Sequence, residues 1–146
     1  MVLLAHDYFM IELQKARTEV NMYGSIEKMS ASLPGITEYR FAQFQEVEAI
    51  LELLNIQLRR IRGERFRHYL ESYNRDLTTR DAEKYADSDS KVLDFSEVVN
   101  LFALVRNRYA GVLKGLETQG YQINNITRLR AAGMEDAFLS EVHVPE

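Results

Sequence analysis

The feature that most constrains this chain is a run of apolar residues at seven-residue spacing in its C-terminal half. One heptad position holds Phe95, Phe102, Tyr109 and Leu116, and another holds Val98, Val105 and Val112. This spacing places both sets on one face of a helix and is typical of helices that pair along their length. It predicts a long helix over residues 92–119, which Gly120 would end. Gly111 and Gly115 lie on one face of that helix, where small residues permit another backbone to approach closely.

A second heptad pattern predicts another long helix over residues 37–76. Its two apolar positions hold Phe44, Leu51 and Leu58, and Val47, Leu54 and Ile61. Thr37 is a plausible N-cap. At the next two positions of the pattern stand Arg65 and His68, so the apolar seam ends where arginines accumulate. At a rise of about 1.5 Å per residue, a helix over 37–76 is too long for so small a chain to fold over all of it. It therefore needs a paired helix or a second subunit to cover its apolar face.

The remaining segments complete an all-α fold with coiled-coil-like helix pairing. Only two prolines and seven glycines interrupt 146 residues, and no segment alternates as a strand does. Leu33-Pro34-Gly35 predicts a chain break, and Thr78 with Asp81 resembles a capping box. The last dozen residues are expected to be loosely ordered. The sequence therefore predicts a single helical domain over 1–146, with helices over 1–33, 37–76, 78–87, 92–119 and 121–131.

The sequence excludes several kinds of functional site. There is no cysteine, so disulfides, thiolate metal sites and cysteine nucleophiles are excluded. Gly115 and Gly120 have the glycine spacing of a phosphate-binding loop, but the Lys and the Ser or Thr that such a loop requires do not follow them. Asp87 and Asp89 are not followed by the glycine and glutamate that a calcium loop requires. We therefore expect no enzyme activity, no metal and no cofactor. The N-terminus shows neither a secretory signal nor a membrane span, which indicates a cytoplasmic protein.

Arginine is concentrated in one segment of an otherwise acidic chain. Residues 59–80 hold seven arginines and three acidic residues, whereas the whole chain has a net charge of −4. Arginine favours planar, bidentate contact with phosphate and stacks on bases. Aromatic side chains lie among the arginines, as in surfaces that bind single-stranded nucleic acid. The candidate DNA-binding residues are Arg59, Arg60, Arg62, Arg65, Arg67, Tyr69 and Tyr73.

Two other interpretations of this segment remain open. Arg60 with Glu64 and Arg67 with Glu71 are spaced as ion pairs along a helix, and the aromatic residues would then belong to the core. Arg65 and His68, at seam positions, could also specify the register between helices. Alternatively, the arginines could bind an acidic protein partner, which would make the chain a helical assembly or adaptor protein.

The C-terminal half resembles the UvsY recombination mediators of T-even and related phages. The resemblance covers residues 59–131 and is carried by two stretches with the family's order and spacing. The first is Ala86-Asp87-Ser88-Asp89 leading to Val92, and the second is Leu116-Glu117-Thr118-Gln119-Gly120-Tyr121-Gln122-Ile123-Asn124-Asn125-Ile126. Gln119 stands where the family has Arg, and Asn124 where it usually has Lys. The first 35 residues do not match.

The resemblance implies a small all-helical protein that forms ring-like homo-oligomers. It also implies binding to single-stranded DNA and loading of a phage recombinase onto strands coated by single-strand binding protein, in recombination and repair. The family's basic-x-basic pair looks like Arg65-Phe66-Arg67 with Tyr69, which implies DNA contact at Arg65 and Arg67. The protein would then lie in the host cell cytoplasm.

Overall fold

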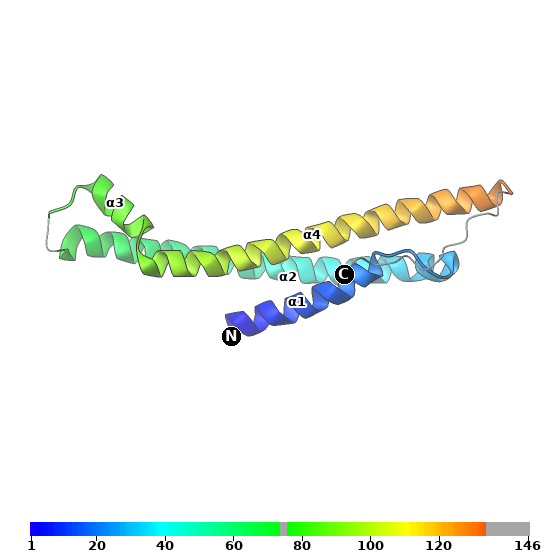
Figure 1. Cartoon of the computed structure of the whole chain (residues 1–146), viewed down its shortest axis with the longest axis horizontal. Coiled ribbons are helices and arrows are strands. Elements are labelled where there is room, and N and C mark those ends of the chain that lie inside the picture. Colours follow the sequence, from blue (N-terminus) through cyan, green and yellow to red (C-terminus); the bar gives the residue numbers. More distant parts are fainter. Residues whose placement is uncertain (74–75, 134–146) are drawn as a thin grey trace. The chain divides into compact units, whose positions relative to one another are not determined.

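The computed structural model describes residues 1–73 and 76–133, and it is all-helical there, as predicted (Figure 1). The chain divides into two compact units, one of Met1–Gln45 with Val105–Glu146 and one of Glu46–Leu104. Two long helices contribute to both units. In chain order the elements are α1 (Val2–Glu19), α2 (Ile26–Arg67), the π-helix η1 (His68–Ser72), α3 (Thr79–Asp87) and α4 (Ser90–Ala131). No described helix is long and apolar enough to cross a membrane.

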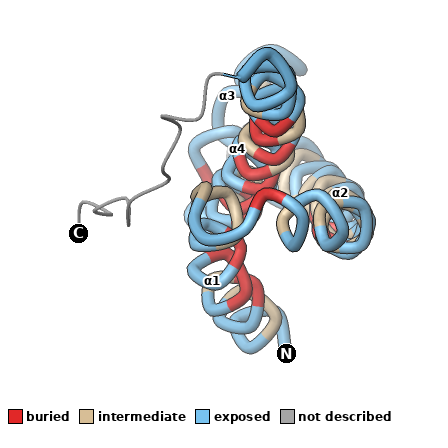
Figure 2. The backbone as a smooth tube through the Cα atoms, turned by 90° about the vertical axis from the view of Figure 1, so that its right-hand side faces the viewer, coloured by how far each residue is buried: buried red, intermediate tan, exposed pale blue. Residues whose placement is uncertain are grey.

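The first unit is built on the heptad face of α4. Tyr109, Val112 and Leu116 are buried there, and Tyr109 meets Phe9 of α1 edge to face, with ring centroids 6.1 Å apart. Figure 2 shows the buried stretches of α1 and α4. The predicted α4 stripe is confirmed as core at Phe102, Val105, Tyr109, Val112 and Leu116, whereas Phe95 and Val98 at its N-terminal end are only half-buried. α1 buries Phe9, Leu13 and Ala16, which are spaced at i, i+4 and i+7. This stripe was not predicted from the sequence, because the apolar residues of the segment do not form one clean face.

A polar network crosses the core of this unit. Arg40 of α2, only 2% exposed, donates through Nη1 to Glu12 Oε2 at 2.8 Å and through Nη2 to Glu19 Oε1 at 2.6 Å. Gln43 donates to Glu12 Oε2 at 3.1 Å and accepts from the Tyr109 hydroxyl at 3.2 Å. Hydrogen bonds from Gln43 and Arg40 lower the pKa of Glu12 to about 2. These contacts link α1, α2 and α4 through paired groups, so the buried charges are compensated.

The second unit has a smaller apolar core. It is formed by Val47 and Leu54 of α2, Ala82 and Ala86 of α3, and Val92, Val99 and Phe102 of α4. Thr78 caps α3: its Oγ1 accepts the Asp81 N–H at 3.2 Å and donates to the Asp81 carboxylate at 2.8 Å. The predicted cap and short helix are therefore confirmed within one residue.

The predicted helix over 1–33 is wrong, because the chain breaks at residues 20–25. The side-chain Nε2 of Gln119 lies 3.0 Å from the carbonyl oxygens of both Glu19 and Val20, at the end of α1. Gly24 then takes a φ of +75°, which favours glycine, and Ser25 Oγ accepts the Lys28 N–H at 3.4 Å. Ser25 is thus the N-cap that begins α2.

The predicted break at Leu33-Pro34-Gly35 is also wrong, since Pro34 lies inside α2. Proline removes one backbone hydrogen bond from a helix. The helix nevertheless continues through Pro34 to Arg67. Leu33 Cδ2 lies 3.4 Å from the position that a Cβ on Gly120 of α4 would occupy.

The predicted end of a helix at 119 and a separate helix over 121–131 are wrong as well. α4 continues through Gly120 to Ala131. A glycine inside a helix costs about 1 kcal/mol, whereas the heptad positions continue past it with Ile123, which is buried. Burial of an isoleucine offsets that cost.

Three further expectations concern helix bounds, the chain end and the number of domains. The helix predicted over 37–76 begins eleven residues earlier and ends at Arg67, where η1 follows. The expectation for the last dozen residues lies outside the described part. The chain was expected to form one domain, and two compact units are found.

Candidate nucleic-acid interface

The predicted site residues lie on the C-terminal part of α2 and on η1, in the unit Glu46–Leu104. Arg59, Arg60, Arg62, Arg65 and Arg67 belong to α2, Tyr69 to η1, and Tyr73 follows η1 directly. The structure divides them into side chains bound within the unit and side chains left exposed to solvent.

Asp89 accepts hydrogen bonds from two of the predicted DNA-binding residues. Its Oδ2 accepts hydrogen bonds from Arg65 Nε and from the Tyr69 hydroxyl, both at 2.8 Å, and its Oδ1 accepts the Lys91 N–H at 2.9 Å. Asp89 is 8% exposed and directly precedes α4, which makes it the N-cap of that helix. Burial alone would raise the pKa of Asp89, but these hydrogen bonds hold it below its usual value. Arg65 and Tyr69 are therefore partly occupied by a contact that positions α4.

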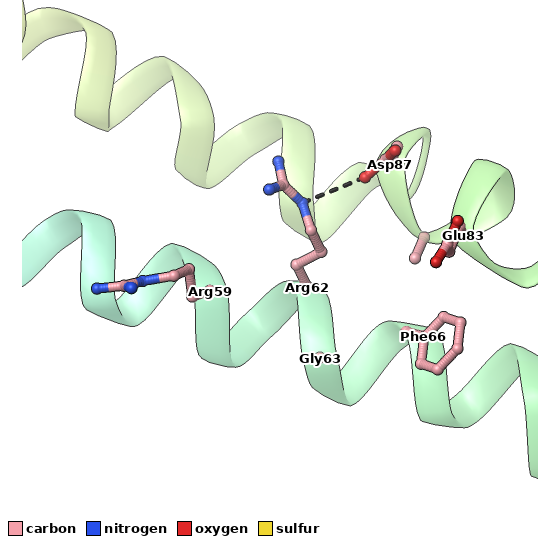
Figure 3. Close-up of a pocket in the computed structure, with 7 residues that line it drawn as sticks. Arg59, Arg62, Gly63, Phe66, Glu83 and Asp87 are labelled. Atoms are coloured by element: carbon pink, nitrogen blue, oxygen red, sulfur yellow. Dashed lines mark ion pairs between the residues drawn. The ribbon is translucent and has the colours of Figure 1, made fainter.

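A groove lies between α2 and α3 (Figure 3). Its cavity has a volume of about 470 Å³ and is lined by Arg59, Arg62, Gly63, Phe66, Glu83, Ala86 and Asp87. Arg62 extends from α2 toward Asp87, with Nε 3.2 Å from Oδ1. Both side chains are about half exposed, so this ion pair is weak. The groove offers two guanidinium groups and one aromatic ring, opposed by two carboxylates.

Three tyrosines form a cluster beside η1. The ring centroids of Tyr69 and Tyr73 are 5.4 Å apart, those of Tyr69 and Tyr85 5.5 Å, and those of Tyr73 and Tyr85 5.9 Å. Tyr73 and Tyr85 are 42% and 47% exposed. π-helical turns are frequent at functional sites. Tyr85 was not predicted to be a site residue, because the sequence does not show that α3 packs beside Tyr69 and Tyr73.

The other arginines are exposed. Arg60 and Arg67 form no ion pair with any residue of 1–73 or 76–133, and the spaced pairs Arg60–Glu64 and Arg67–Glu71 do not form there. Arg59 Nη2 lies 3.8 Å from Glu52 Oε1, at the limit of an ion pair, and both side chains are largely exposed. Residues seven apart share a helix face, so Arg60 and Arg67 lie about 10.5 Å apart along one side of α2. Arg60 and Arg67 on this side, together with Arg59 on the neighbouring side of α2, are called the exposed arginine face.

The acidic residues considered for calcium have other roles. Asp87 pairs with Arg62, and Asp89 caps α4. Within the described ranges, no group of three or more His, Asp or Glu side chains is placed to hold a metal ion. His68, at a seam position of the heptad, is exposed.

Comparisons with known proteins find no match, whether with models of protein families, with curated proteins or with solved structures.

Proposed function

We propose that this protein is a non-enzymatic single-stranded DNA-binding protein whose contact surface is the exposed arginine face of α2 together with Tyr73 and Tyr85. The observation that carries the proposal is the freedom of Arg60 and Arg67, which form no ion pair with the described residues. Phosphate can therefore bind both guanidinium groups without displacing a carboxylate of this unit. Their spacing along the helix allows both to contact one strand.

Aromatic side chains supply the second component of such a surface. Every base has a π-face, so stacking on exposed tyrosine rings is tolerant of sequence. Tyr73 and Tyr85 are about half exposed, and the aromatic ring of Phe66 lines the neighbouring groove. Phosphate attraction combined with stacking favours a flexible single strand over a duplex, whose bases are already stacked.

Two of the predicted DNA-binding residues receive a different role. Arg65 and Tyr69 share Asp89, so we assign them to positioning of α4 and not to first contact with phosphate. Arg62 is intermediate: its pair with Asp87 is exposed, and phosphate competes well for a guanidinium group held so weakly.

The resemblance to the UvsY family supports a more specific role as a recombination mediator. The protein would bind single strands as a homo-oligomer and help a phage recombinase replace single-strand binding protein, in the cytoplasm of the host cell. Repetition of a weak site around an oligomer would increase overall affinity. ATP hydrolysis would belong to the recombinase, and the mediator itself would need no cofactor.

One observation favours the alternative, an adaptor that binds an acidic protein. Carboxylates already bind Arg62 and Arg65 within this unit, so acidic side chains are able to match the segment. An acidic partner would then bind the exposed arginine face in the same manner. Binding of nucleic acid distinguishes the two functions.

The test is fluorescence anisotropy of a labelled oligo-dT strand at low and moderate salt, with a duplex of equal length as comparison. We expect salt-sensitive binding that favours the single strand. In Arg60→Ala/Arg67→Ala the salt slope should fall by about 1.4, because each phosphate that is no longer neutralised reduces it by about 0.7. Lys114→Ala/Arg128→Ala removes two positive charges from α4 and serves as the matched control. Absence of binding by the folded wild-type protein would reject the DNA function and favour the adaptor.

A further inference from the structure

The groove between α2 and α3 differs in charge from the exposed arginine face beside it (Figure 3). Its lining includes two guanidinium groups and two carboxylates, so the formal charges cancel. They belong to Arg59 and Arg62 of α2 and to Glu83 and Asp87 of α3. Carboxylates repel phosphate, so an anionic group gains little from this lining. The groove therefore suits a ligand that is itself neutral.

The size and the walls of the groove suit a flat ring. Its cavity of about 470 Å³ lies within the range of about 300–1,000 Å³ that is usual for small-molecule sites. The half-buried Phe66 ring provides an aromatic surface on which another ring can stack. A Cβ placed at Gly63 would meet nothing within 4 Å, so this part of the groove is open. A nucleobase is a flat, neutral ring with hydrogen-bonding edges, and it fits this lining.

One carboxylate of the groove is available to a ligand. Asp87 is bound to Arg62, with 3.2 Å between Oδ1 and Nε, whereas Glu83 forms no hydrogen bond or ion pair with any residue of 1–73 or 76–133. Glu83 lies one turn before Asp87 on α3, so the two share a face of that helix. An ionised carboxylate only accepts hydrogen bonds. A ligand at Glu83 must therefore donate them.

Guanine matches this arrangement better than the other three DNA bases. Its N1–H and N2–H₂ groups donate side by side, so a single carboxylate accepts from both, and its O6 and N7 accept from arginine. Adenine and cytosine each offer one amino group, and thymine offers one N–H between two carbonyl oxygens, which a carboxylate repels. We propose that the groove between α2 and α3 binds one guanine base of the DNA strand. Glu83 accepts from its N1–H and N2–H₂ groups, Arg62 donates to its O6 and N7 edge, and Phe66 stacks on the ring.

The groove adjoins the proposed DNA surface. Arg59 belongs both to the exposed arginine face and to the lining of the groove, and Tyr85 directly precedes Ala86, which also lines it. A strand whose phosphates are bound by the exposed arginine face can therefore turn one base into the groove while neighbouring bases stack on tyrosine. The inference rests on the proposed DNA-binding function and adds to it one position at which the identity of the base matters.

The test is fluorescence anisotropy with oligo-dT and with a strand of equal length that carries a single central dG. The dG strand should bind about fivefold or more tightly, which is the discrimination that a bidentate base contact gives. A strand with deoxyinosine at that position lacks the N2 amino group and should lose most of this gain. A strand with dA stacks as a purine but lacks the pair of donors, so it should gain little.

Two variants separate the groove from the rest of the surface, with the ratio of the two affinities as the readout. In Glu83→Gln the ratio of dG strand to oligo-dT should approach one, and general charge effects cancel in it. Gly63→Leu should act likewise, because leucine would occupy the open part of the groove, while binding of oligo-dT by the exposed arginine face is retained. Glu97→Gln, at an exposed position of α4 in the same unit but outside the groove, is the matched control and should keep the full preference.

A free nucleotide is a second possible source of guanine. It lacks the neighbouring phosphates that the exposed arginine face binds, so dGMP at the concentration of the strand should not displace it. Displacement under these conditions would overturn the assignment of the groove to a base of the strand.

Other results would also overturn the inference. Equal affinity of the wild-type protein for oligo-dT and for the dG strand would reject the guanine site and leave the DNA-binding function in place. Equal gains from dG and dA would assign the gain to purine stacking, and an unchanged preference in Glu83→Gln would exclude its carboxylate. Absence of binding to every strand would reject the DNA-binding function and this inference with it.

Discussion

Arg65 Nε lies 2.8 Å from Oδ2 of Asp89, so an arginine near the end of α2 is bound to the residue that precedes α4. Sequence reasoning grouped Arg65 with the other arginines as a DNA contact. The contact with Asp89 gives it a positioning role and leaves Arg59, Arg60 and Arg67 as the exposed arginine face.

Replacing Asp89 with alanine should destabilise the protein by about 2 kcal/mol or more, since the change removes an N-cap and buried hydrogen bonds to a carboxylate. Urea unfolding followed by circular dichroism measures the effect. Asp87→Ala, which removes an exposed partner of Arg62, should change stability by no more than about 0.5 kcal/mol. Equal effects of the two variants would contradict the assigned role of Asp89.

Arg40 is expected to be one of the most sensitive positions for stability. Arg40→Ala leaves Glu12 and Glu19 without their guanidinium partner, and breaking a buried ion pair from one side costs about 3–5 kcal/mol. Thermal and urea unfolding are the measurements. Lys15→Ala, which removes an exposed partner of Glu12, should cost far less.

Stability should fall in acid between about pH 4.5 and pH 2. The pKa of Glu12 is lowered from 4.5 to about 2 in the folded protein, so the unfolded chain binds its proton first as the pH falls. The ionised Glu12 side chain therefore stabilises the fold fully above pH 4.5. This contribution, on the order of 3 kcal/mol in total, is lost as the pH falls from 4.5 to the pKa of the folded protein. Urea unfolding at several pH values measures the slope. In Glu12→Gln the slope over this window should be visibly shallower, and an unchanged slope would exclude Glu12 as its source.

Gly115 and Gly111 should respond oppositely to alanine. A Cβ at Gly115 would lie 2.6 Å from Val20 Cγ1, so Gly115→Ala should destabilise by about 1–3 kcal/mol. A Cβ at Gly111 meets nothing within 4 Å, so Gly111→Ala should stabilise α4 by up to about 1 kcal/mol. Chemical unfolding of the two variants tests the pair. Val20→Ala should recover part of the loss in Gly115→Ala, because it removes the clashing methyl groups.

The exposed tyrosines should contribute to DNA affinity. Tyr73→Ala or Tyr85→Ala should weaken oligo-dT binding by about 1–3 kcal/mol if each ring stacks on one base. Anisotropy titration at constant salt measures the change. Tyr121→Ala removes an exposed ring from the other unit and should leave affinity unchanged. A loss that is equal in all three variants would indicate a general effect unrelated to stacking.

Local periodicity was enough to predict the all-α fold and the core face of α4. The face of a helix repeats every few residues, so the positions of Phe102, Tyr109 and Leu116 follow from spacing alone. The concentration of arginine was likewise visible in the chain. The cap at Thr78 was predictable because both partners lie within one turn.

Only the tertiary structure decided what depends on contacts between distant residues. Gln119 binds the carbonyls that end α1 about 100 residues earlier, and α2 continues through Pro34 while Leu33 packs beside Gly120. Local propensity predicted the opposite at both places. Its preferences amount to a few kcal/mol at most, and tertiary packing routinely outweighs them. The same holds for the arginines. Their number and type are properties of the sequence, whereas the choice of which arginines are paired and which are free depends on where folding brings Asp87 and Asp89.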